Sequence, residues 1–306
     1  MGHHHHSHEH HHHHHMEKLQ SLNTIFVVCI AVNLLFVVIE AGIGFFANSL
    51  SLLSDAGHNL SDVFSLLLVL IAFRLAKIHP NANYTFGYKK STVLISLLNA
   101  IILLVAVVLI VVESIYKFQK PTSVDGATIS WTAGIGIIIN GLTAVMLMRS
   151  QKTDLNVRGA YLHMVADTLV SVGVVVSGLV ISLTGWYVVD PIVSLVIAVV
   201  ILVSTWRLLS DSLRLSLDGM PEGLSLEQAT DLLRNHENVV DVHHVHIWAI
   251  STTDNALTAH VVVDSIEAME ATKKDLKQAL RQMGIGHSTL EFETTSAHCA
   301  DEACSD

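Results

Sequence analysis

The sequence has little charge and few cysteines. Charged residues make up only 14% of the 306 residues and hydrophobic residues 51%, whereas about a quarter of the residues in a soluble domain are charged. The three cysteines are too few for a disulfide framework. Lysine and arginine total 17 against 27 acidic residues, a formal net charge of −10. No basic stripe exists to neutralise phosphates, so nucleic acid is not expected as a partner.

Long apolar runs fill the first two thirds of the chain. A membrane-spanning helix needs about 20 mostly apolar residues, and six candidate spans end at polar or Pro/Gly breaks: 24–46, 50–76, 91–117, 127–149, 157–183 and 189–210. The sequence therefore predicts an α-helical polytopic membrane protein with six transmembrane helices within residues 17–216. Residues 217–295 have the composition of a soluble domain, and 296–306 form a C-terminal tail.

The basic residues of the loops predict the orientation. They flank the second-to-third and fourth-to-fifth connections, as Lys89 and Arg149 do, and follow the sixth span, as Arg207 does. The opposite side has only Lys117 and Lys120. By the positive-inside rule, both termini lie in the cytoplasm, and we expect a multi-pass protein of the cell (inner) membrane.

Two of the spans contain ionisable residues at matching spacing. His58 and Asp62 lie in the second span, and His163 and Asp167 in the fifth. Residues four apart share one face of a helix, so two such faces can supply two imidazole nitrogens and two carboxylates. That is a complete tetrahedral ligand set for Zn²⁺. A lone intramembrane His or Asp often only bonds a neighbouring helix, but the repeated spacing favours a metal site.

The ligand types favour transport over storage. Structural zinc sites prefer thiolates, whereas nitrogen and carboxylate ligands exchange a metal for protons. The sequence therefore predicts secondary active efflux of Zn²⁺, with Cd²⁺ and Co²⁺ as further possible cargoes, in exchange for protons by alternating access. A membrane-anchored metal sensor is the alternative, but it needs no paired intramembrane ligands. An intramembrane metalloprotease needs an open position on the metal, and the sequence has no HExxH motif.

Other polar residues of the spans have less specific roles. Asp55 precedes His58 by three residues and could belong to a second shell of the site, to a proton path, or to a structural cap. Glu40, Asn33, Asn99 and Asn140 are expected to hydrogen-bond between helices.

The soluble domain shows the order helix, strand, strand, helix, strand, which predicts a small α+β fold. Its histidines suggest a second metal site. Strict alternation along the first strand would place His244 and His246 on one face and His243 on the other. In the tail, His298, Cys299 and Cys304 could bind a further metal or be disordered.

Residues 1–16 contain 11 of the 21 histidines. Such a tract binds metals whatever its origin, and it is either native or an affinity tag followed by a start at Met16. Because polyhistidine precedes the first apolar run, no cleavable signal peptide is expected.

Several motifs resemble the cation diffusion facilitator family, particularly its zinc-transporting branch of bacterial zinc/proton antiporters. They are SLSLLSDAGHNLSD, YTFGYKK, NVRGAYLHMVADTLVSVGV, VVDVHHVHIW, ALTAHVVV and, less closely, HSTLEFE. The resemblance covers about residues 22–295. It implies a homodimer formed through the cytoplasmic domain and the transmembrane helices, a metallochaperone-like cytoplasmic domain, and antiport of divalent metal ions and protons across the bilayer.

The resemblance also implies roles for single residues. His58, Asp62, His163 and Asp167 match the transport ligands, and histidine at position 58, where other relatives have aspartate, favours zinc. A cytoplasmic site, for a regulatory or structural Zn²⁺, matches His243, His260, His287 and an acidic residue of the last strand. Glu293 fits when the strand is aligned from its end, and Glu291 is the alternative. The spacing of Cys299 and Cys304 departs from the CxxC of some relatives.

Overall fold

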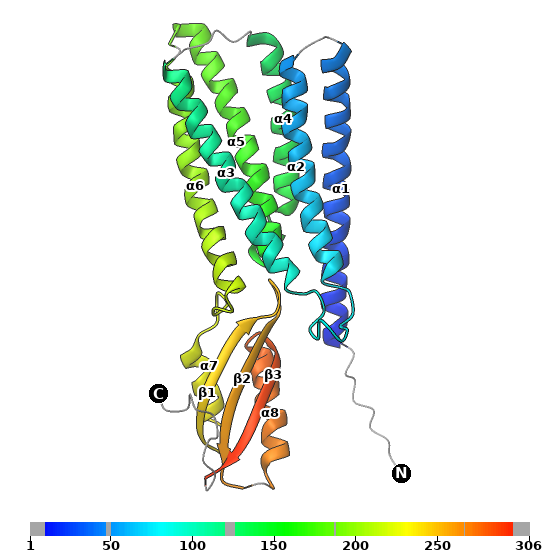
Figure 1. The fold of residues 1–306 in the computed structure, drawn as a ribbon, viewed down its shortest axis with the longest axis vertical. Helices are drawn as coiled ribbons and strands as arrows, with labels where there is room; N and C mark the ends of the chain where they lie inside the picture. Colours follow the sequence, from blue (N-terminus) through cyan, green and yellow to red (C-terminus); the bar gives the residue numbers. More distant parts are fainter. Residues whose placement is uncertain (1–9, 47–49, 120–125, 187, 266, 296–306) are drawn as a thin grey trace. The chain divides into compact units, whose positions relative to one another are not determined.

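The computed structural model describes residues 10–46, 50–119, 126–186, 188–265 and 267–295. The side chains of some of these residues, Asp55 and His58 among them, are outside the description. Contacts divide the chain into two compact units, one of Met1–Ile78 with Ile95–Leu209 and one of His79–Leu94 with Ser210–Asp306. Figure 1 shows the elements of both.

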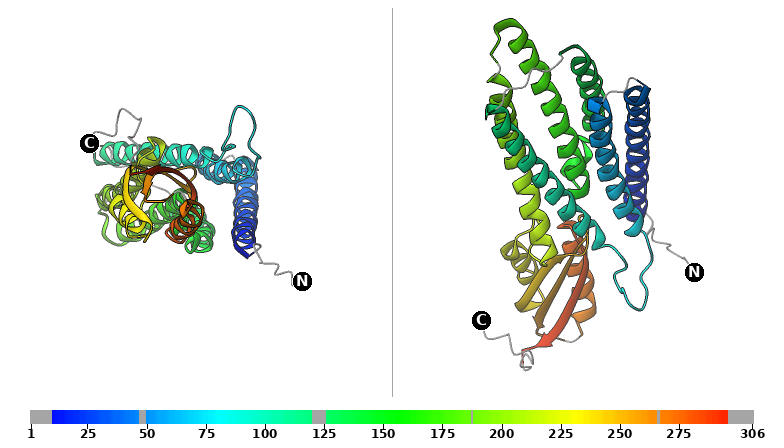
Figure 2. Two further views of the ribbon diagram at one scale, coloured as in Figure 1. Left: turned by 90° about the horizontal axis from the view of Figure 1, so that it is seen from below. Right: turned by 45° about the horizontal axis from the view of Figure 1, so that its top comes forward.

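The first unit is built from six long helices. They are α1 (His10–Phe46), α2 (Leu50–Leu75), α3 (Ser91–Gln119), α4 (Gly126–Leu147), α5 (Leu155–Thr184) and α6 (Val189–Ser216), with a 3-10 turn η1 (Ser150–Lys152) before α5. In the views of Figures 1 and 2, α1 runs beside α2 and α4 beside α5. The helix α2 also contacts α5. These bounds follow the six expected ranges, except that α1 begins earlier, at His10.

Four helices of the described residues are long and apolar enough to cross a membrane: Thr24–Ile43, Ser91–Gln119, Leu155–Ile181 and Pro191–Ser216. Gly134–Leu147 is a shorter apolar helix. The chain is thus an integral membrane protein by length and composition of its helices. The helix α2 does not reach this threshold among the described residues.

The helix that bears His163 has defined ends. Asp154 is the N-cap of α5, and its carboxylate accepts hydrogen bonds from the backbone N–H groups of Asn156 and Val157 at 2.7 and 3.3 Å. Such a cap satisfies N–H groups that have no partner inside the helix. At the other end, Gly185 adopts φ 70°, and its N–H bonds the carbonyl of Ile181. These caps fix which residues lie in the helix.

Buried polar side chains link neighbouring helices, as expected for Asn33 and Glu40. The amide of Asn33 donates to Thr143 Oγ1 at 3.1 Å, joining α1 to α4. The amide of Asn59 donates to Glu40 Oε2 at 2.8 Å, joining α2 to α1. Such bonds between helices fix their rotation, because an unpaired polar group in lipid is costly.

The second unit contains a three-stranded sheet covered on one face by helices. Its elements are α7 (Leu226–Arg234), β1 (Val239–Ala249), β2 (Asn255–Val263), α8 (Met269–Gln282) and β3 (Ile285–Thr294), which confirms the predicted order. The sheet order is β1-β2-β3, with β1 antiparallel and β3 parallel to β2. The buried core combines side chains of α7 and α8, such as Leu233 and Leu276, with those of the strands, such as Leu257.

Residues His79–Leu94 complete this unit, although they precede it by more than a hundred positions. The ammonium group of Lys90 donates to the carbonyls of Leu215 and Ala249 at 2.8 and 3.0 Å, and to Asp218 Oδ1 at 2.6 Å. Asp218 has φ 56°, and the N–H of Gly219 bonds Arg214 O at 2.8 Å. This is a Schellman end for α6, and Lys90 binds directly to it.

Candidate metal centres

Three side chains from two helices meet inside the first unit. His163 Nε2 lies 2.9 Å from Asp62 Oδ1 and 3.7 Å from Asp167 Oδ2. Asp62 comes from α2, whereas His163 and Asp167 lie one turn apart on α5. Asp62 is 1% exposed and His163 7%. The expected partnership of the second and fifth spans therefore brings these three residues together.

The spacing of the three side chains suits a small cation. One ligand atom from each lies within 4.8 Å of the others. Four ligands at 2.0–2.2 Å from a tetrahedral Zn²⁺ stand about 3.4 Å from one another, and the distances of 2.9 and 3.7 Å lie on either side of that value. Two carboxylates and one imidazole supply oxygen and nitrogen ligands without a thiolate. The group can thus hold a divalent cation or protons in its place.

The fourth expected ligand, His58, lies on α2 one turn before Asp62. Its side chain is outside the described part of the chain, and so is that of Asp55. The helical backbone nevertheless places positions 58 and 62 on one face of α2. A ligand from position 58 would complete the tetrahedral set.

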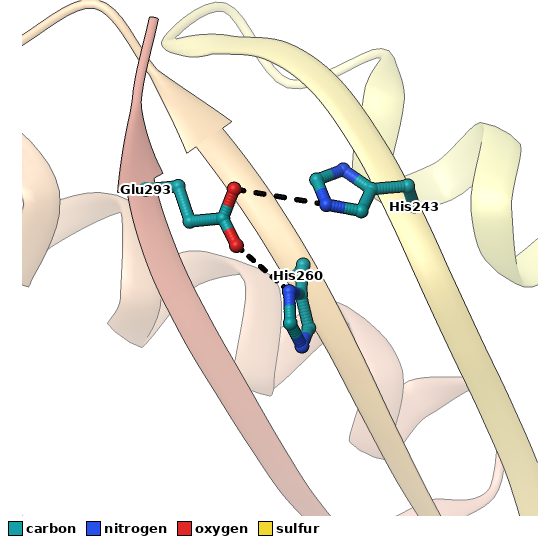
Figure 3. A group of neighbouring side chains, drawn as sticks. All are labelled: His243, His260 and Glu293. Carbon is teal, nitrogen blue, oxygen red and sulfur yellow. Dashed lines mark hydrogen bonds and ion pairs between the residues drawn. The ribbon is translucent and has the colours of Figure 1, made fainter. Parts of the chain in front are cut away.

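A second group lies on the sheet of the other unit. His260 Nδ1 is 2.8 Å from Glu293 Oε1, and His243 Nε2 is 3.6 Å from Glu293 Oε2. The three residues come from β2, β1 and β3, and Figure 3 shows the carboxylate reaching toward both imidazoles. His243 Nε2 is buried and makes no hydrogen bond among the described residues. A buried nitrogen without such a bond next to a carboxylate fits a cation ligand.

A β-bulge places His243 in this group. Pairing runs from His243↔His260 to His246↔Thr258, so β1 uses one residue more than β2 between these points. His244 in the bulge has φ 54°. The expected alternation, with His243 and His246 on opposite faces, is therefore wrong, because the extra residue returns both to the same face. His244 instead packs its ring 5.2 Å from that of His260.

The remaining expected residues take different places. Glu291 Oε2 lies 3.6 Å from His260 Nε2, on the other side of that ring from Glu293. His287 is not brought to the group: it pairs with Ala256 in the sheet, and its ring packs on Phe86 at 5.4 Å. His298, Cys299 and Cys304 lie outside the described residues. Sequence reasoning had not placed His244 beside His260, because only the bulge turns it there.

Comparison with known proteins covers almost the whole chain. Residues 26–215 match the family described as the cation efflux transmembrane domain, and residues 221–293 match the cation efflux protein, cytoplasmic domain.

Curated relatives agree with both matches. The chain is 37% identical to the "Cadmium, cobalt and zinc/H(+)-K(+) antiporter" of Bacillus subtilis (strain 168), over 88% of each chain. It is 36% identical to "Zinc transporter ZitB" of Escherichia coli (strain K12), over 87% of this chain and 86% of the relative. It is 34% identical to "Metal cation efflux system protein CzcD" of Cupriavidus metallidurans, over 90% of this chain and 88% of the relative. With both domains matched, the chain belongs to the cation efflux family, as a transporter and not an enzyme.

Proposed function

We propose that the chain exports Zn²⁺, and with it Cd²⁺ or Co²⁺, from the cytoplasm in exchange for protons. The cation binds between His58, Asp62, His163 and Asp167. The observation that carries this proposal is the meeting of Asp62, His163 and Asp167 between α2 and α5. Buried ionisable residues are expensive inside a membrane and mark ion pathways by default. The names of the relatives from B. subtilis and E. coli support zinc, cadmium and cobalt as cargo.

Proton exchange follows from the chemistry of the ligands. Each carboxylate and imidazole must lose its proton to bind the metal, and each can take a proton when the metal leaves. The inward electrical force is about 2.3 kcal/mol per charge per 100 mV, and it opposes export of Zn²⁺ but favours entry of H⁺. Coupling the two movements through one set of ligands therefore gives export a source of energy.

The same proposal includes the arrangement in the membrane. All six helices α1–α6 cross the inner membrane, and both termini lie in the cytoplasm, since the basic loops lie on that side. The match to a cytoplasmic domain for residues 221–293 supports this orientation. We also infer a homodimer formed through this domain and the transmembrane helices.

His243, His260 and Glu293 would hold a second ion with a regulatory or structural role. Glu291 lies close enough to His260 to bind next to it. Because the ligands come from three different strands, an ion there would join β1, β2 and β3 in one cross-link. Metal binding to such a group adds directly to folding stability.

Transport is tested with purified protein in liposomes that carry an imposed pH gradient. Asp167→Asn keeps the size of the side chain but removes a charged ligand, so Zn²⁺ uptake should fall to background. The matched control is Glu113→Gln, because Glu113 is an exposed α3 carboxylate paired with Lys117. Uptake that survives in Asp167→Asn would disprove the assignment of the site. Competition among zinc, cadmium, cobalt and manganese then ranks the cargoes.

A further inference from the structure

A buried amide on α3 makes no hydrogen bond among the described residues. Asn99 is 4% exposed, and neither Oδ1 nor Nδ2 has a hydrogen-bond partner there. Asn33 and Asn59, by contrast, bond across helices. A buried polar group without a partner costs about 1–3 kcal/mol. The sequence predicts that Asn99 joins helices in this way, but the described part of the chain shows no such bond.

The position of Asn99 is tied to the metal-binding helix. A Cβ atom added at Gly159 of α5 would lie 3.4 Å from Asn99 Cβ and 3.7 Å from Asn99 Nδ2. The missing side chain of Gly159 therefore lets the amide approach α5. Gly159 precedes His163 by four residues, so it lies on the same helical face, about 6 Å along the axis. The amide thus stands one turn from a ligand of the transport site.

A second buried polar side chain lies nearby, on α6. Thr205 on α6 is 0% exposed, and its hydroxyl makes no hydrogen bond among the described residues. It comes between Ile201, which packs in a cluster with Ala166, and Leu208, which would touch a Cβ at Gly159. That places Thr205 at the level of the turn that contains His163. Hydroxyl and amide groups therefore face one region bounded by α3, α5 and α6.

Asn99 lies between the His163 group and one end of the bundle. The helix α3 begins at Ser91 and α5 at Leu155, so Asn99 and Gly159 lie two turns and one turn inside those ends. A cation that moves from this end to His163 must shed water, and neutral oxygen atoms can replace that water. Because an amide has no charge, it binds a divalent cation weakly enough to release it again.

We propose that Asn99 is a specificity-determining residue on the cation route, with its amide oxygen replacing hydration water as a divalent cation passes to or from His163. Thr205 supplies a second neutral oxygen about one turn further along, at the level of His163. This inference rests on the proposed function and adds a position on the cation route that lies outside the four ligands. A carboxylate at position 99 would hold the cation instead of passing it on.

The test compares three substitutions at position 99 in full-length protein in liposomes. Asn99→Leu removes the polar atoms at similar volume, Asn99→Gln keeps the amide, and Asn99→Asp adds a charge. We expect Asn99→Leu to lower the initial rate of Zn²⁺ uptake at least about fivefold, the effect of losing one hydrogen-bonding group. Asn99→Gln should retain more uptake than Asn99→Leu, and Asn99→Asp should bind an additional Zn²⁺ while transporting more slowly.

Two further readouts separate this role from a structural one. Asn99→Leu should leave Zn²⁺ affinity within about twofold of the parent value and should not lower the melting temperature, because it removes an unsatisfied group. Ser114→Ala is the matched control, because Ser114 is also buried on α3 but its hydroxyl donates to Ile110 O of its own helix. Zn²⁺ uptake by this variant should equal that of the parent protein. Parental uptake in Asn99→Leu, or a loss of uptake together with a lower melting temperature, would overturn the inference.

Asp167→Asn is measured in the same series. If it abolishes uptake and Asn99→Leu does not, only the role of Asn99 is refuted. If Asp167→Asn transports normally, the proposed function itself fails.

Discussion

Glu293 occupies a position between two imidazoles that come from neighbouring strands. Its two oxygens lie 2.8 Å from His260 Nδ1 and 3.6 Å from His243 Nε2. His260 also has Glu291 near its other nitrogen, at 3.6 Å. His260 is therefore the residue of this group with the most neighbours that can bind a cation, and its loss should affect binding most directly.

His260→Gln should weaken binding of Zn²⁺ to the group of His243, His260 and Glu293 by more than about tenfold, since even loss of an outer partner of a ligand costs 10–100-fold. The measurement is calorimetric titration of protein that lacks residues 1–15 and carries Asp167→Asn, Cys299→Ser and Cys304→Ser, so that the other candidate sites are removed. His246→Gln is the control, because His246 lies outside the group of His243, His260 and Glu293. Equal losses in the two variants would contradict the assignment.

The residues of the transmembrane group could be predicted from spacing alone, but their contact could not. Four-residue spacing places His163 and Asp167 on one face of α5. The distance of 2.9 Å between Asp62 and His163 depends on how α2 packs against α5. Local sequence patterns do not determine this tertiary packing. The lack of a hydrogen bond at Asn99 among the described residues could not be predicted either, because it depends on which groups of α5 and α6 pack against this side chain.

At the scale of elements, the sequence predicted the order of the helices and strands, but α1 begins at His10 instead of residue 24 and the expected alternation fails inside β1. A period of two assumes that no residue is inserted, whereas His244 adds one residue at φ 54°. Histidine tolerates this left-handed conformation better than β-branched residues do. The sequence VHHVHIW does not indicate which residue is the extra one in the bulge.

His244→Gly and His244→Val test the bulge. Glycine adopts positive φ without strain, whereas a β-branched residue there should cost about 1–2 kcal/mol more. Urea unfolding of the second unit can be followed by the fluorescence of Trp248 after Trp131, Trp186 and Trp206 are replaced by Phe. The valine variant should unfold at lower urea than the glycine variant. Equal midpoints would mean that residue 244 does not hold this conformation in solution.

Gly219→Ala tests the end of α6. A Cβ at Gly219 would lie 2.6 Å from Arg214 Cγ and 2.8 Å from Arg214 O, and a backbone oxygen cannot rotate away. We expect destabilisation of about 1–3 kcal/mol, the usual effect of an overpacked site, in the same urea assay. Gly286→Ala serves as control because a Cβ there meets nothing within 4 Å. A Gly219→Ala variant as stable as this control would contradict the close approach.

At the scale of the whole molecule, the second unit is assembled from two separate stretches of chain. Lys90 joins them through bonds to Leu215, Asp218 and Ala249, and Lys89 adds an ion pair with Asp254 at 2.9 Å. The sequence predicted a domain from residue 217 onward, because composition changes there. It gave no reason to join residues 79–94 to that domain, since such contacts form only in the folded chain.

Lys90→Met should destabilise the second unit by about 1–3 kcal/mol, because two carbonyls lose a charged donor. The ion pair with Asp218 contributes less, since that carboxylate is 67% exposed. The Trp248 urea assay applies here too, with Lys273→Met as control, because Lys273 pairs with Glu270 of its own helix, α8. A parental midpoint in Lys90→Met would show that the two stretches are not joined through this residue.

The divided origin of this unit bears on how the protein is made. When Lys90 is added to the growing chain, 159 more residues must be added before the chain reaches Ala249, whose carbonyl it will bind. The stretch around Lys90 can therefore meet these partners only after α3, α4, α5 and α6 have been synthesised, since long-range contacts form only after their loop closes. Chimaeras joined only near residue 217 would mismatch these halves, so exchanges between relatives should carry residues 79–94 together with the C-terminal domain.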